Sequence, residues 1–231
     1  MSTNDAIRRK FYKACKEGNL ELVQKFVEEE RVDPTADNNG AIRWAARNGH
    51  LDVVKFLFTQ PGVNPTACDN YAFHEAARNG HLGVVKFLVT LPDVDPTADD
   101  NVSFRWAARS GHLDVVKFLV TLPGVDPAAK YNEAIQWTAC NGHVGVVTFL
   151  ITLPGVDPTV LGNSAIWLAS QYGYIEVVLE LVPHTPNVPL KVITPELESL
   201  VFKRACELSR LDLPAELCWL IGECIWGSGS G

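Results

Sequence analysis

The sequence lacks any apolar run long enough to span a bilayer, which argues against a membrane protein. Its amino-terminal stretch mixes charged and apolar residues, so it has no signal-peptide core. Positive charge is also scarce, because 20 Lys and Arg stand against 27 Asp and Glu, and a formal net charge of -7 argues against a general nucleic-acid binder. The six cysteines form no C-x-x-C pair, so we expect reduced thiols and a cytoplasmic or nuclear location.

Motifs that carry chemistry are missing as well. No glycine-rich phosphate loop is present, and neither His74 nor His184 has a Ser, Cys or carboxylate neighbour at a spacing that indicates a catalytic triad. Asp33 and its periodic equivalents precede prolines, and we interpret them as turn formers rather than as a catalytic pair. We therefore expect no enzymatic activity, no metal and no cofactor.

What the sequence does contain is an internal repeat with a period of 31 residues, the spacing from Gly49 to Gly80. The periodic glycines are Gly18, Gly49, Gly80, Gly111, Gly142 and Gly173, and four of them are followed directly by His50, His81, His112 or His143. Asparagines (Asn39, Asn70, Asn101, Asn132, Asn163) and prolines (Pro34, Pro65, Pro96, Pro127, Pro158) keep the same interval. Such regularity predicts an array of identical structural units.

Each unit is predicted to contain two short helices. In residues 39–69, apolar and small residues at helical spacing predict a first helix that ends at Gly49, where glycine's access to positive φ favours a helix end. A more hydrophobic second helix follows and ends before Pro61, because proline disfavours helical geometry in the preceding residue. Two such helices cannot bury their apolar faces alone, so neighbouring units must stack.

The segment A-A-R-N-G-H-L-D-V-V-K-F-L and its copies resemble the ankyrin repeat over residues 7–183. The resemblance implies an all-α solenoid of stacked helix-turn-helix repeats, a single elongated domain with short inter-repeat turns. Two features depart from the family pattern. The family's T-P-L-H tetrapeptide is replaced, with only His74 retained, and the period is shorter than the usual value of about 33. The missing residues fall in the hairpin finger, which puts partner contacts by finger tips in doubt.

We predict six repeats in residues 1–193, divided as 1–38 (an amino-terminal cap), 39–69, 70–100, 101–131, 132–162 and 163–193. Near the other end, Phe202-x-x-Ala205-Cys206 matches Phe11-x-x-Ala14-Cys15 of the first repeat. We therefore expect a divergent capping helix pair over residues 194–226, followed by a flexible Gly/Ser tail over 227–231.

Two periodic side chains have competing interpretations. One histidine per repeat leaves neighbours roughly 10 Å apart, too far to share a zinc ion, so we expect the Gly-His histidines to be structural. The resemblance implies that they hydrogen-bond backbone at the turn between helices. Trp44, Trp106 and Trp137 share a position with Glu75 and Leu168; we favour inter-repeat packing over an exposed aromatic platform. Trp167, one residue earlier in its repeat, is the better exposed candidate.

The main functional signal is a basic row at the end of successive first helices. We predict that partners bind a concave face formed by this row and the residues beside it, namely Lys16, Arg47, Asn48, Arg78, Asn79, Arg109, Ser110, Asn141, Trp167 and Tyr172. The pattern fits an acidic partner segment with an apolar anchor. A solvated charged edge, repeated because the units were duplicated, also explains the row, so both interpretations stay open.

Three classes of function remain. The first is a non-enzymatic scaffold, a monomer that binds another protein and neither a membrane nor a nucleic acid. The second is a substrate adaptor of a ubiquitin ligase, because Leu213-Pro214-Ala215-Glu216-Leu217 resembles the opening of an F-box, although a capping helix explains the same pentapeptide. The third is an RNA or anion binder that uses the basic row, which the acidic net charge disfavours.

Overall fold

The computed structural model describes residues 3–185, and every element in that range is helical. The predicted helix pair over 194–226 and the tail over 227–231 lie outside the described residues. The helices are α1 (Thr3–Glu17), α2 (Leu20–Glu28), α3 (Ala36–Arg47), α4 (Leu51–Phe58), α5 (Ala67–Arg78), α6 (Leu82–Leu88), α7 (Ala98–Arg109), α8 (Leu113–Leu119), α9 (Ala129–Cys140), α10 (Val144–Leu150), α11 (Val160–Gln171) and α12 (Ile175–Leu181), with a 3₁₀ turn at Val182–His184. The all-α prediction and the two helices per repeat are confirmed.

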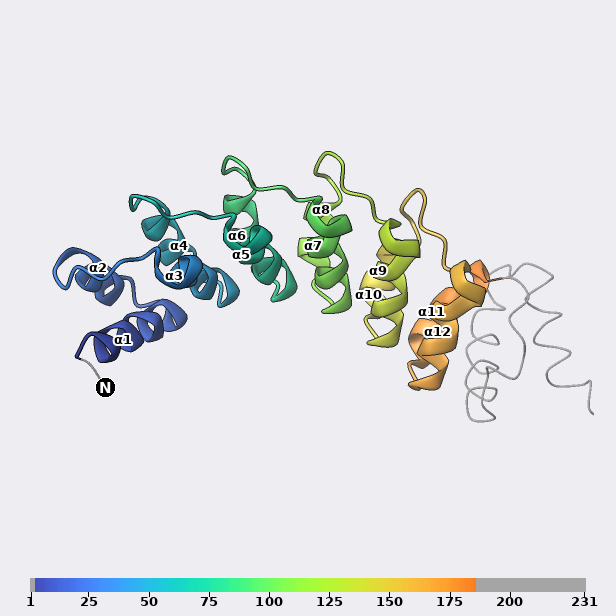
Figure 1. Cartoon of the computed structure of the whole chain (residues 1–231). Coiled ribbons are helices and arrows are strands. Elements are labelled where there is room, and N and C mark those ends of the chain that lie inside the picture. Colours follow the sequence, from blue (N-terminus) through green and yellow to red (C-terminus); the bar gives the residue numbers. More distant parts are fainter. Residues whose placement is uncertain (1–2, 186–231) are drawn as a thin grey trace, which may run out of the picture. The chain divides into compact units, whose positions relative to one another are not determined.

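The chain divides into two compact units, with the division between Ala134 and Ile135 inside α9. In the first unit, the first helix of each repeat contacts the first helix of the next, so that α1, α3, α5 and α7 form one layer (Figure 1). The second helices α2, α4, α6 and α8 form the other layer in the same order. In the second unit, α12 packs against both α10 and α11.

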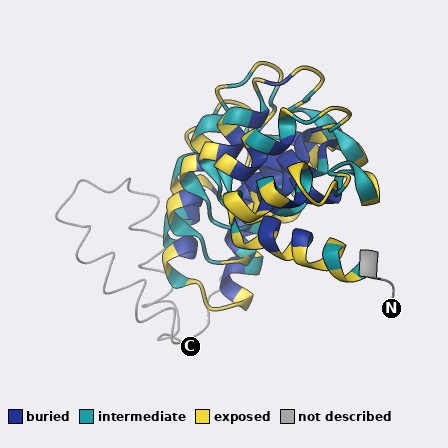
Figure 2. Cartoon of the chain, turned by 90° about the vertical axis from the view of Figure 1, so that its left-hand side faces the viewer, coloured by how far each residue is buried: buried dark blue, intermediate teal, exposed yellow. Residues whose placement is uncertain are grey.

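The core of each repeat combines small residues on the first helix with branched residues on the second. Ala45 and Ala46 are fully buried and permit close approach of neighbouring helices, while Val53, Val54 and Leu57 of α4 are buried against them. Figure 2 shows buried residues on the inward faces of the helices and exposed residues on the loops and outward faces. The predicted period therefore corresponds to one helix pair with a buried inner face.

A left-handed turn of three residues begins each first helix after α1. The turns are Asp37–Asn39, Cys68–Asn70, Asp99–Asn101, Lys130–Asn132 and Leu161–Asn163. Residues other than glycine pay about 1–2 kcal/mol each for this conformation, although Asn and Asp tolerate it best. Arginine side chains from the same helix stabilise two of the turns. Arg43 Nη2 donates to the carbonyl of Asp37 at 2.7 Å, and Arg105 donates to the carbonyls of Asp99 and Asp100.

The periodic asparagine is the last residue of each of these turns, and in two repeats its side chain also ties the turn to the next loop. Asn39 Oδ1 accepts the backbone N–H of Asn64 at 2.8 Å, and Asn101 Oδ1 accepts that of Asp126 at 3.0 Å. The residue before each proline forms the loop itself. Asp33 Oδ1, for example, accepts both the N–H and the hydroxyl of Thr35. The prediction that the periodic aspartates are turn formers is thus confirmed, and their carboxylates have a structural role in the loops.

Candidate functional site

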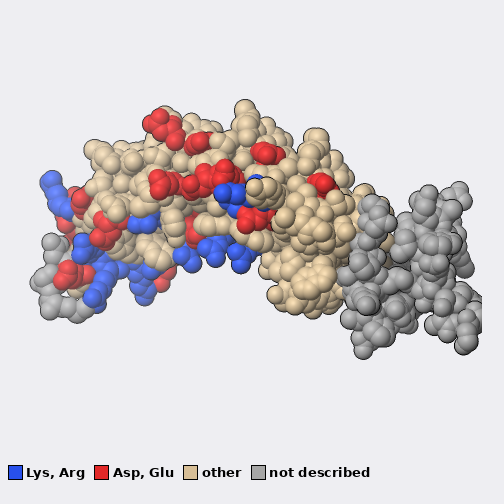
Figure 3. All heavy atoms as spheres, turned by 45° about the vertical axis from the view of Figure 1, so that its right-hand side comes forward, with Lys and Arg blue, Asp and Glu red and all other residues tan. Residues whose placement is uncertain are grey.

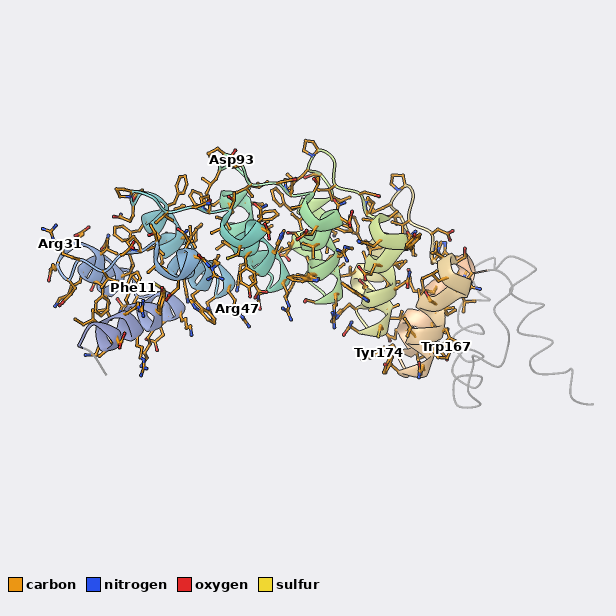
Figure 4. The ribbon with its side chains drawn as sticks, viewed as in Figure 1. Phe11, Arg31, Arg47, Asp93, Trp167 and Tyr174 are labelled. Carbon is orange, nitrogen blue, oxygen red and sulfur yellow. The ribbon has the colours of Figure 1, made fainter. Side chains whose placement is uncertain are left out.

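The basic row lies where the first helices of the first unit end. Lys16, Arg47, Arg78 and Arg109 occupy the last turns of α1, α3, α5 and α7, and all four are exposed. Basic side chains are favourable there because the last carbonyls of a helix carry partial negative charge. Figure 3 shows Lys and Arg along the lower border of the first unit with Asp and Glu above them, and Figure 4 places Arg47 at the end of α3 away from the loop at Asp93.

The Gly-His pairs connect this row to the next repeat. Nε2 of His50 donates to the carbonyl of Lys16 at 2.7 Å, and Nε2 of His81 donates to the carbonyl of Arg47 at 2.9 Å. The backbone of two row residues is therefore held from the following repeat. The predicted structural role of the histidines is confirmed at these two positions, and burial lowers the pKa of His81 below its usual value of 6.5.

Glycine precedes the histidine for two physical reasons. Gly49 has a φ of +79°, and a Cβ added there would come within 2.4 Å of Nδ1 of His81 in the next repeat. A Cβ added at Gly18 or Gly80 would likewise collide with the ring of His50 or His112, respectively. In the last described repeat a tyrosine takes the place of histidine, and Tyr174 lies over Gly142. At these four positions glycine is thus required by both its left-handed backbone and the ring stacked on it.

A buried carboxylate joins two members of the row, which sequence reasoning missed. Glu75 is 1% exposed, and its carboxylate lies 3.4 Å from Nε of Arg47 and 3.3 Å from Nη1 of Arg78. The side-chain amide of Asn79 also donates to Glu75. One signal for this arrangement was visible in the sequence, since Glu75 occupies the position that is tryptophan in three other repeats. The pairing lowers the net charge of the row and fixes the direction of two guanidinium groups.

Two of the tryptophans, Trp44 and Trp106, lie beside the row rather than deep in the core. Trp44, Trp106 and Trp137 are half-buried, so the predicted inter-repeat packing is only partly met. The ammonium of Lys16 lies 3.7 Å from the centre of the Trp44 ring, and the guanidinium of Arg78 lies 5.3 Å from the centre of the Trp106 ring. The indoles therefore support the cationic side chains through cation–π contacts, which sequence reasoning did not anticipate.

The asparagines predicted beside the row use their amide groups within their own helices. Asn48, Asn79 and Asn141 donate from Nδ2 to the carbonyls of Trp44, Glu75 and Trp137 at 2.6–2.8 Å. These side chains cap helix ends, where carbonyls lack intrahelical partners. Ser110 is the corresponding C-terminal cap residue of α7. Capping thus accounts for three of these four side chains, and a contact of any of them with a partner stays a prediction.

The second unit presents a different surface. Residues 135–185 contain no Lys or Arg, and Figure 3 shows this part of the chain almost without blue atoms. Trp167 is 51% exposed and Tyr172 is 57% exposed, so the expected exposure of Trp167 is confirmed. The rings of Tyr172 and Tyr174 lie 6.4 Å apart. The predicted site residues here, Asn141, Trp167 and Tyr172, are therefore uncharged, in contrast to the basic row of the first unit.

His74 is buried in the first unit and has a structural partner. Its Nδ1 lies 2.6 Å from the hydroxyl oxygen of Ser103, and burial lowers its pKa below the usual value of 6.5. No group of three or more His, Cys, Asp or Glu side chains suited to a metal ion occurs within residues 3–185. In that same range, no helix has the length and apolar character that a bilayer crossing requires. His184 is exposed.

Comparisons with known proteins agree with this architecture. The family model described as ankyrin repeats (3 copies) matches residues 11–100, 59–131 and 104–191. Among solved structures, the crystal structure of the human ASB11 ankyrin repeat domain is similar with a TM-score of 0.61 and 14% sequence identity, over 78% of this chain and 85% of that chain. At this identity the likeness shows the shared fold. No curated protein sequence gave a match. Because the family model covers most of its length, the chain belongs to the ankyrin-repeat family.

Proposed function

We propose that the chain is a non-enzymatic protein-binding module whose first unit binds an acidic segment of a partner along the basic row of Lys16, Arg47, Arg78 and Arg109. Ankyrin repeats are generally binding modules without catalytic activity, which supports the general class. The observation that carries the finer proposal is the arrangement at Glu75. It holds Arg47 and Arg78 in fixed directions while their side chains stay 44% and 54% exposed.

Holding the guanidinium groups in place favours binding in two ways. A free arginine side chain loses rotamer freedom when it binds, whereas one already oriented by Glu75 loses less. Each guanidinium also has five N–H groups, and Glu75 engages one nitrogen of Arg47 and one of Arg78. The remaining donors suit carboxylates, which accept paired N–H groups from arginine. Glu75 still offsets one positive charge of the row, so we expect modest, salt-sensitive affinity.

The second unit supplies an uncharged contact. Tyr172 and Tyr174 are exposed neighbours whose rings have a large apolar surface and a polar tip. We propose that these two rings bind an apolar residue of the partner. We also propose that the binding takes place in the cytoplasm. The adaptor hypothesis depends on Leu213–Leu217, which lie outside the described residues, so no structural observation favours it.

The test is a selection of random peptides displayed on phage, performed on the full chain. The first variant combines Arg47→Gln with Arg78→Gln. The matched control combines Lys55→Gln with Lys86→Gln, which removes the same charge from exposed side chains on the second helices α4 and α6. The two variants can be compared only if they are equally stable, which is checked by equal midpoints of urea unfolding.

We expect the wild-type chain and the control to enrich peptides rich in Asp and Glu, and the first variant to bind the same peptides about tenfold more weakly or worse. Enrichment of neutral or basic peptides on the wild type would contradict the proposal. Equal loss of peptide binding in the two variants would assign the effect to total charge rather than to the row.

Fluorescence anisotropy with labelled single-stranded RNA tests the third class of function, an RNA or anion binder. We expect no binding at physiological salt.

A further inference from the structure

The structure limits the distance between neighbouring charges of the basic row. Nζ of Lys16 lies 3.7 Å and Cζ of Arg47 lies 5.4 Å from the centre of the same Trp44 ring, so these two charged groups are at most about 9 Å apart. Nε of Arg47 and Nη1 of Arg78 lie 3.4 Å and 3.3 Å from the two oxygens of the Glu75 carboxylate, which limits their separation to about 9 Å as well. Because packed helices are about 8–10 Å apart, the row presents one cation per repeat at an interval of about 9 Å.

The contacts that set this interval belong to the fold and need no partner. Glu75 is 1% exposed, and it joins Arg47 to Arg78 from within the first unit. The ring of His81 also holds the carbonyl of Arg47 from the following repeat. A partner that uses the whole row must therefore present its own charges at the interval of the repeats.

Among the regular conformations of a peptide, polyproline II fits this interval. It has three residues per turn and a rise of about 3.1 Å, so every third side chain points to the same side at intervals of about 9 Å. In a β-strand, every third residue is about 10 Å away but points to the opposite face. In an α-helix, side chains two turns apart on one face are separated by about 11 Å, which exceeds the limit set by Trp44 and Glu75.

The tryptophans beside the row supply a second feature of polyproline II recognition. Trp44 and Trp106 are half-buried, so part of each indole reaches the surface next to the cations that it contacts. Proline-rich segments in this conformation bind to surfaces lined by aromatic rings. Proline also fixes the conformation before binding, so that little conformational entropy is lost in the complex.

We propose that the partner segment is a polyproline II helix with an acidic residue at every third position, so that successive carboxylates bind successive repeats of the basic row. The residues between the carboxylates, prolines above all, pack on Trp44 and Trp106. This inference rests on the proposed function, because it names the class of acidic segment that the basic row selects.

Three labelled peptides with four glutamates each test the spacing on the full chain, with fluorescence anisotropy at about 0.15 M salt as the measurement. The first is E-P-P-E-P-P-E-P-P-E. The second, E-P-E-P-P-P-P-E-P-E, has the same composition and charge but no two glutamates three residues apart. The third is an alanine-rich helical peptide with glutamates every seven residues. We expect the first peptide to bind about tenfold more tightly than either of the others.

A scan of the first peptide tests the register. Each glutamate is replaced in turn by glutamine, and every peptide is measured on the wild-type chain, Arg47→Gln and Arg78→Gln. We expect each replacement to weaken binding to the wild type about threefold or more, whereas Arg47→Gln makes one position insensitive. In Arg78→Gln the insensitive position moves by three residues. Lys55→Gln, on the second helix α4, is the matched control and leaves all four positions sensitive.

The outcomes separate this inference from the proposed function. Equal affinity for the three peptides, reduced in each case by Arg47→Gln, would overturn the polyproline II spacing and leave the proposed function in place. Tighter binding of the helical peptide would overturn it in favour of an α-helical segment. An insensitive position that stays the same in Arg47→Gln and Arg78→Gln would also overturn it. Absence of binding by all three peptides would overturn both the inference and the proposed function.

Discussion

Substitution of Gly49 by alanine tests the physical role of the Gly-His pair. Gly49 has a φ of +79°, and an added Cβ would lie 2.4 Å from Nδ1 of His81. Gly173 is the matched control, because its φ is +74° and no atom among the described residues lies within 4 Å of an added Cβ. Gly173→Ala therefore introduces backbone strain alone, whereas Gly49→Ala adds a collision with the ring that holds the carbonyl of Arg47.

The expected magnitudes follow from these contacts. Alanine at a left-handed position costs about 1–2 kcal/mol, offset in part by a stiffer unfolded chain, so Gly173→Ala should lose about 1 kcal/mol. Gly49→Ala should lose about 3–5 kcal/mol, since displacement of His81 adds about 1–3 kcal/mol of repacking and about 1 kcal/mol for the lost hydrogen bond. Adding His81→Ala to Gly49→Ala removes the collision and should restore about 1–2 kcal/mol.

Urea unfolding followed by circular dichroism measures these differences, and each variant is compared by its free energy of unfolding. Equal losses for Gly49→Ala and Gly173→Ala would refute the reasoning, because the collision with His81 would then carry no cost. A double variant that is less stable than Gly49→Ala alone would refute it as well. In that case the histidine would stabilise the repeat through a contact other than the one at Gly49.

Three further predictions concern single side chains of the first unit. Burial lowers the pKa of His74, so the unfolded chain takes up a proton first as the pH falls below 6.5. The free energy of unfolding of the wild-type chain should therefore decrease as the pH is lowered from about 7.5 to 5.5, and it should decrease less in the His74→Gln variant. An equal decrease in the two chains would contradict this prediction. Arg105→Leu removes the donors to two turn carbonyls and to Glu133 and should cost about 2–4 kcal/mol in urea unfolding; a loss below about 1 kcal/mol contradicts it. Asp93→Gly should stabilise the chain by up to about 1 kcal/mol, because Asp93 has a φ of +66° at a position where three other repeats have glycine. Thermal unfolding should then show a slightly higher midpoint, and a lower midpoint contradicts the prediction.

The sequence predicted the fold well because its period is a direct record of the architecture. Gly49 and its equivalents end the first helices, and Pro61 and its equivalents follow the second helices, so the boundaries of the helix pairs can be located from these two residue types. The left-handed turns were not predicted in detail. Asp37–Asn39 is rich in residues that tolerate positive φ, but Lys130 and Leu161 adopt the same conformation with no such preference.

The alignment of the basic side chains in one row could be predicted from the sequence, whereas their contacts could not. The spacing of Arg47 and Arg78 placed them in one row, as the structure shows. Their pairing with Glu75 depends on side-chain directions across two helices, which a period alone does not specify. The capping role of Asn48 and Asn79 was likewise hidden, because an asparagine past a helix end serves equally for capping and for recognition.

The most direct test of binding along the basic row is zero-length crosslinking with a carbodiimide, which joins a carboxylate to a lysine amine within contact distance. An acetylated acidic peptide from the phage selection is coupled to the full chain, and the modified lysines are identified by mass spectrometry. The proposal predicts coupling at Lys16, the row's only lysine, whose ammonium lies 3.7 Å from the centre of the Trp44 ring. Coupling confined to Lys55 and Lys86 on the second helices would contradict it.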